Sequence, residues 1–164
     1  MADKSNFTPD EWKLLLESVM MAGMAVTAAD PSGLWGLLKE SFASGTALAK
    51  VKLDNAGNPL IKAVVADFDT SEGRSAARDG LKAKLSGASG IEIKSRCIDT
   101  LRQVSTLLDN KAPADAGAFK AWLRQISQGV AEAASEGGFF SGVQVSDAEK
   151  ATLTEISSAL KLAA

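Results

Sequence analysis

The densest group of oxygen-bearing side chains lies between Asp67 and Gly73, where the sequence reads DFDTSEG. An Asp-x-Asp-x-Ser start is typical of a calcium-binding loop, whose alternate side chains supply oxygen ligands to the ion. Such a loop needs glycine at its sixth position and a bidentate glutamate at its twelfth. Here the glycine is seventh and the twelfth residue is Arg78. We therefore interpret the segment as the end of one helix followed by the cap of the next.

The residues that most active sites are built from are missing. The chain has no histidine, no tyrosine and one cysteine. Ser-His-Asp and Cys-His nucleophile systems are thereby excluded, as are Cys/His zinc sites, His-ligated haem and Glu-x-x-His di-iron sites. Acid–base chemistry by carboxylates, lysine or arginine alone stays open. We predict no catalytic, metal-binding or cofactor-binding residue and no bound cofactor, and we favour a protein that is not an enzyme.

Two further features invite a chemical interpretation. The glycine-rich segment Ser86–Gly90 precedes a predicted helix, but it lacks the Gly-Lys-Ser/Thr ending of a phosphate-binding P-loop and follows no strand. We interpret it as a connector. Cys97 lies on the apolar stripe of its helix, and free cysteines of this kind usually pack as small hydrophobes. We therefore expect it in the core.

Charge and hydropathy bear on partners and location. The net charge is −2, from 18 basic and 20 acidic residues, whereas a nucleic-acid-binding domain usually carries a basic excess. The uncharged stretch from Ser18 to Ala29 is shorter than the roughly 20 residues of a spanning helix, and the first residues do not resemble a secretory signal. We expect no nucleic-acid partner, no membrane span and a cytoplasmic protein, and the lone cysteine fits a reducing compartment.

The first predicted helix is well delimited. Thr8 and Glu11 form a capping box around Pro9, and Phe7 can pack on Trp12 as a hydrophobic staple. We expect this helix to run to about Ala28. Its first half carries a polar face marked by Lys13 and Glu17. Its second half, residues 19–26, is apolar on every side, which predicts a helix buried at the centre of the fold.

Helical periodicity continues along the chain. A second helix is predicted from Asp30-Pro31. Residues 51–65 fit either a helix starting at Asn58-Pro59 or a β-hairpin, and we favour the helix. Further helices are predicted over residues 70–85 and from a capping box formed by Ser89 and Glu92. Another begins near Phe119, with an apolar stripe on one side and Lys120 on the polar side. The last is predicted from Ser146 to the end of the chain. We predict one all-α domain over residues 1–164, a compact bundle of about six or seven helices, with residues 1–6 disordered.

Two groups of apolar residues are candidate functional sites. One is the loop after the Gly137-Gly138 stop, with Gly138, Phe139, Phe140 and Val143 as a candidate contact surface. The alternative is that its two phenylalanines plug the end of the bundle. The other group is Met20, Met21 and Met24, which could line an internal pocket for an apolar ligand. The alternative for these methionines is ordinary core packing.

Two segments also show a resemblance. The sequence from Val130 to Lys150 looks like a segment of small all-helical bacterial proteins of unassigned function, and that from Phe7 to Leu38 has a similar look. The resemblance implies a bacterial protein and no particular activity. From all these observations we expect a protein that acts through protein–protein contacts or self-association. The alternative is a carrier of a small apolar ligand in the bundle interior.

Overall fold

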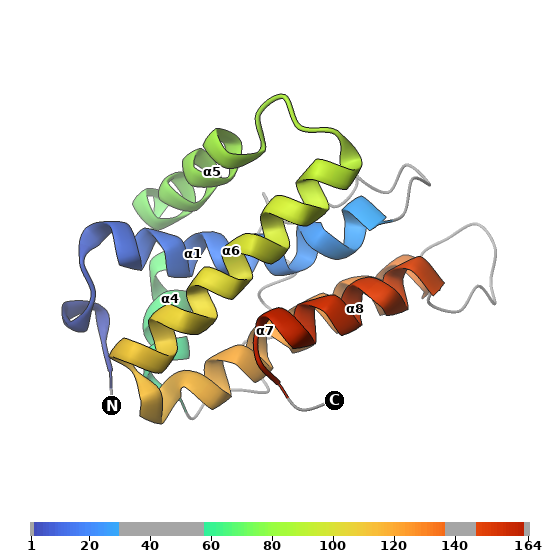
Figure 1. Ribbon diagram of the computed structural model, residues 1–164. Helices are drawn as coiled ribbons and strands as arrows, with labels where there is room; N and C mark the ends of the chain where they lie inside the picture. Colours follow the sequence, from blue (N-terminus) through green and yellow to red (C-terminus); the bar gives the residue numbers. More distant parts are fainter. Residues whose placement is uncertain (1, 30–57, 137–146, 163–164) are drawn as a thin grey trace.

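The computed structural model describes residues 2–29, 58–136 and 147–162. Within these ranges it has six α-helices, a short 3-10 helix and no strand (Figure 1), so the predicted all-α bundle is confirmed. The elements are the 3-10 helix Lys4–Asn6 and the α-helices α1 (Pro9–Ala29), α4 (Pro59–Phe68), α5 (Ser71–Leu85), α6 (Gly90–Lys111), α7 (Pro113–Glu136) and α8 (Asp147–Ala159). The helix predicted from Asp30-Pro31 lies outside the described residues.

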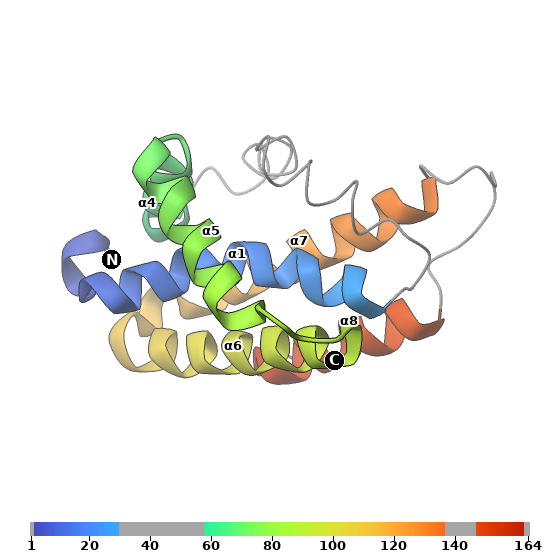
Figure 2. The same ribbon diagram turned by 90° about the horizontal axis from the view of Figure 1, so that it is seen from above.

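Helix α1 is the element around which the others pack. In Figure 1, α1 and α7 run in one direction, while α6 and α8 run back in the other. Helices α5, α6, α7 and α8 all pack on α1, and Figure 2 shows α4 and α5 beside its N-terminal half. Residues 15–19 and 21–27 of α1 are buried without interruption. The central position predicted from the all-round apolar sequence is therefore confirmed.

The predicted start signals form real caps. Thr8 donates its N–H to Glu11 Oε2 at 2.8 Å, and Glu11 donates its own N–H to Thr8 Oγ1 at 3.2 Å. Asn58 caps α4 by accepting the N–H groups of Leu60 and Ile61. The helix alternative is therefore right for residues 59–65, and the hairpin alternative is wrong there. Among the described residues, no helix is both long enough and apolar enough to cross a membrane.

Within residues 1–6, which we expected to be disordered, the structure places residues 2–6 against the rest of the bundle. Ala2 is buried, and its N–H donates to Asp115 Oδ2 at 2.8 Å. Asn58 Nδ2 donates to the other carboxylate oxygen at 3.0 Å. A buried carboxylate needs hydrogen-bond donors to offset its lost hydration. Asp115, only 2% exposed, therefore joins the N-terminal segment, the start of α4 and the start of α7.

Two charged residues expected on polar helix faces are buried instead. Glu17 of α1 is 4% exposed, and its Oε2 lies 2.6 Å from Lys84 Nζ of α5. Lys120 of α7 is 6% exposed, and its Nζ donates to Asp109 Oδ1 at 2.5 Å. Helical spacing alone placed both on the polar side. The neighbouring helices cover them and supply the opposite charge that a buried ion requires.

Helix α5 turns away from α4 so tightly that Gly73 has no room for a side chain. A Cβ at this position would overlap the backbone carbonyl of Asp67. We expect Gly73→Ala to lower the free energy of unfolding by about 1–3 kcal/mol, as overpacking does. In urea titrations, the control Gly117→Ala should instead stabilise by about 0.5–1 kcal/mol, because nothing lies within 4 Å of a Cβ there and alanine is the better helix former. Equal effects at both sites would contradict this account.

The ion pair between α1 and α5 gives a second test. Lys84→Met leaves the buried Glu17 carboxylate without its cation, and we expect a loss of about 1–3 kcal/mol in urea unfolding. Lys82→Met on the same helix is the matched control, since Lys82 is exposed, and its effect should stay within about 0.5 kcal/mol. A Lys84→Met variant as stable as the control would show that Glu17 does not depend on this pair.

Candidate functional site

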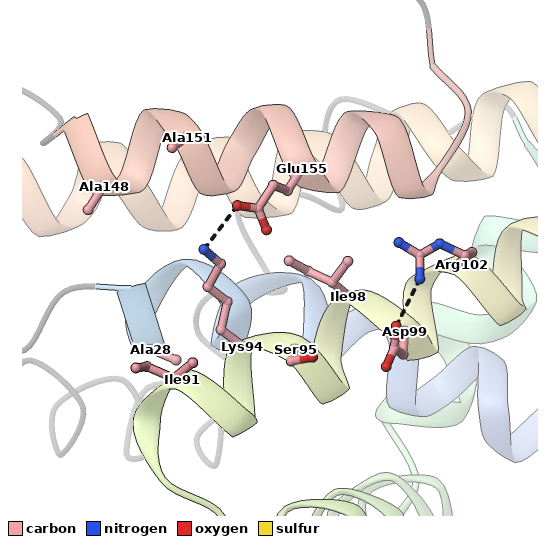
Figure 3. Close-up of a pocket in the computed structure, with 10 residues that line it drawn as sticks. All are labelled: Ala28, Ile91, Lys94, Ser95, Ile98, Asp99, Arg102, Ala148, Ala151 and Glu155. Atoms are coloured by element: carbon pink, nitrogen blue, oxygen red, sulfur yellow. Dashed lines mark hydrogen bonds and ion pairs between the residues drawn. The ribbon is translucent and has the colours of Figure 1, made fainter.

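A groove of about 440 Å³ runs between the first half of α6 and α8 and ends at the last turn of α1. Figure 3 shows its lining from three elements far apart in sequence. The lining residues are Ala28 of α1, Ile91, Lys94, Ser95, Ile98, Asp99 and Arg102 of α6, and Ala148, Ala151 and Glu155 of α8. The groove follows α6 from Ile91 to Arg102, which are separated by roughly 16 Å along the helix at 1.5 Å per residue.

Helical spacing and small side chains account for the groove. Ile91, Ser95, Ile98 and Arg102 follow one another at intervals of three or four residues, so they share one face of α6. Helix α8 contributes Ala148 and Ala151 to the lining and no large apolar side chain, with Glu155 as its one charged residue there. Only Ile98 among the large apolar residues of the lining is buried, at 6% exposure. The result is a hollow between the two helices, lined by the buried Ile98 of α6 and by exposed alanines of α8.

The charged groups of the groove are paired across and along it. Lys94 Nζ lies 3.1 Å from Glu155 Oε1 and bridges α6 to α8 (Figure 3). Arg102 donates to Asp99 Oδ1 at 2.8 Å on the same helix. Exposed pairs of this kind contribute about 0–1 kcal/mol each. These four side chains form the rim of the groove. Its two cations and two anions are paired with each other, so none of the four is free to act as an acid or base.

Ile91 at the end of the groove is the large hydrophobic residue that the rest of the described chain leaves uncovered. Its exposed fraction is 84%, and no other large hydrophobic side chain of the described residues is exposed in this way. Ile91 is not among the sequence-predicted site residues. Ile91 lies seven residues before Ile98, so it continues the same buried stripe. This spacing could have identified Ile91 as part of the stripe. It could not show that the neighbouring helices leave this end of the stripe exposed.

The sequence-predicted contact loop, Gly138, Phe139, Phe140 and Val143, lies outside the described residues. The three methionines do not line the groove. Met21 is fully buried and Met24 is 6% exposed, both within the main core, and Met20 packs against that core. Cys97 is buried beside them, with Sγ 3.3 Å from Met21 Sδ. These positions correspond to the core-packing alternative stated for the methionines and to the expectation for Cys97.

Asp67 has a structural role in place of a metal site. Its Oδ2 accepts hydrogen bonds from Lys4 Nζ at 2.8 Å and from Trp12 Nε1 at 2.6 Å. Partial burial alone would raise the pKa of this carboxyl, but the two donors outweigh burial and hold the pKa below its usual value. Thr70 caps α5 directly after α4 ends, as predicted. No cluster of three potential metal ligands occurs among the described residues.

Comparison with known proteins adds no assignment. No family model matches the chain, and no curated protein or solved structure matches it either.

The burial of Cys97 predicts its reactivity. Burial raises the pKa of the thiol to about 12, so it stays protonated at pH 8, and the neutral thiol is a poor nucleophile. We expect iodoacetamide to leave the folded protein unlabelled at pH 8 and to label Cys97 fully in denaturant, as read by intact mass. A Ser95→Cys variant, which places a thiol at an exposed position of the same helix, is the positive control. Equal labelling rates at the two positions in the folded state would contradict the burial of Cys97.

Proposed function

We propose that this protein is a non-enzymatic contact protein that binds other protein chains through the groove between α6 and α8. The single observation that carries the proposal is Ile91, 84% exposed at the edge of the hollow between them. Exposed apolar surface next to a hollow and rimmed by polar residues is typical of an interaction site. An apolar side chain from a partner would cover Ile91 and enter the hollow between the two helices.

The shape and chemistry of the groove favour a protein partner over a small ligand. Ligand pockets enclose most of the ligand and are mainly apolar, whereas this groove has four charged residues in its lining and opens to solvent beside exposed residues such as Ser95 and Asp99. A polar rim around an apolar centre is the usual arrangement of a protein–protein interface. The ligand-carrier alternative has no supporting observation among the described residues.

The remaining sequence-based expectations belong to the same proposal. We place the protein in a bacterial cytoplasm, on the resemblance of residues 130–150 to bacterial proteins and on the lone cysteine, which fits a reducing compartment. The loop with Phe139 and Phe140 stays a second candidate contact surface on sequence grounds alone. Neither expectation is needed for the groove to bind a partner.

Site-specific photocrosslinking tests the contact function. A benzoylphenylalanine at Ser95, inside the groove lining, should yield a crosslinked adduct in the cells that produce the protein. The same group at Gln103, exposed on α6 but outside the lining, is the matched control. Adding Ile91→Glu should abolish the Ser95 adduct, because a charge replaces the apolar contact. No adduct from Ser95 above the Gln103 level would overturn the proposal.

A further inference from the structure

We propose that the partner bound by this groove is a second copy of the chain, in a symmetric dimer. The inference rests on the proposed contact function and names its partner. Its first support is that one face carries both halves of a contact. Ile91 projects from the end of the groove, and the hollow lined by the buried Ile98 and by the exposed Ala148 and Ala151 lies beside it. A two-fold contact requires this, because each copy must supply both the inserted side chain and the site that receives it.

The charges of the groove supply the second support. Lys94 and Arg102 are balanced by Asp99 and Glu155, so the rim has no net charge. Two copies of a rim with one dominant sign would repel each other, whereas a balanced rim can meet its own image with cations near anions. A strongly acidic or strongly basic partner finds no complementary surface here. The rim is therefore electrostatically suited to a copy of itself.

The cost of leaving Ile91 exposed is the third support. Its side chain contributes little to the fold of one copy, since 84% of it is accessible to water. Covering an exposed isoleucine side chain removes apolar surface from water and so favours association, and a symmetric dimer covers two of them. The groove is short, and interfaces at the small end of the size range are weak and transient. We therefore expect a dimer that forms and separates with protein concentration.

Sedimentation of the purified full chain tests this directly. The wild type should change from monomer to dimer between low micromolar and several hundred micromolar concentrations. Ile91→Glu should sediment as a monomer throughout, and at low concentration its melting temperature should equal that of the wild type. Gln103→Glu adds the same charge to the same helix outside the groove, and it should still dimerise.

Several outcomes of the sedimentation experiment would overturn the dimer. A wild type that stays monomeric, or an Ile91→Glu variant that still dimerises, shows that this face does not pair with itself. A monomeric wild type whose Ile91→Glu variant melts lower shows that another part of the chain fills the groove. The Ser95 photocrosslink separates this failure from that of the contact function. An adduct of twice the 17.0 kDa chain mass supports the dimer, and an adduct of another mass leaves the contact function standing with a different partner.

Discussion

The need to cover α1 on every side is the constraint on which the rest of the structure depends. Most helices bury one stripe and leave the other side to water. From Leu15 to Thr27, α1 has almost no such side. Packing α5, α6, α7 and α8 on it removes that apolar surface from water, which is the dominant favourable contribution to folding. The bundle is therefore arranged as a shell around one central helix.

Polar groups buried within this shell fix where each helix sits. Ser127 Oγ of α7 donates to the carbonyl of Ala22 at 2.7 Å, deep in the core. Asp115 holds the N-terminal segment and the start of α4 to α7 through hydrogen bonds to both. A buried polar group that loses its partner costs about 1–3 kcal/mol, so a shifted helix would forfeit such contacts. Apolar packing brings the helices together, and these pairs select one alignment among many of similar burial.

The groove follows from the same arrangement. Helix α6 continues its apolar stripe back to Ile91, while α8 contributes Ala148 and Ala151 to the groove lining and no large apolar side chain. The ion pair of Lys94 with Glu155 bridges the two helices at the surface without filling the space below. Apolar surface on α6 is thus produced by its own periodicity and left uncovered by its neighbour. This uncovered apolar surface is the basis of the proposed contact with a second protein chain.

The sequence by itself determined the helical class, the central helix and several of the helix boundaries. These depend on local chemistry, such as the Thr8–Glu11 cap and the all-round apolar run before Ala28, which neighbouring residues can specify without help from the rest of the chain. The absence of histidine in the sequence likewise excludes the catalytic and metal sites that require a histidine side chain. The sequence-predicted contact loop lies beyond the residues that the structure describes.

Only the tertiary structure decided which polar faces are buried and where apolar surface stays exposed. Glu17 and Lys120 lie at spacings that a helix alone would place in solvent, and partners from other helices made their burial possible. Ile91 has the opposite outcome, because its stripe predicts burial but the described neighbours leave 84% of the side chain exposed. Periodicity specifies which face of a helix a residue shares, but coverage of that face depends on contacts between segments far apart in sequence. That is why the groove was found in the structure and not in the sequence.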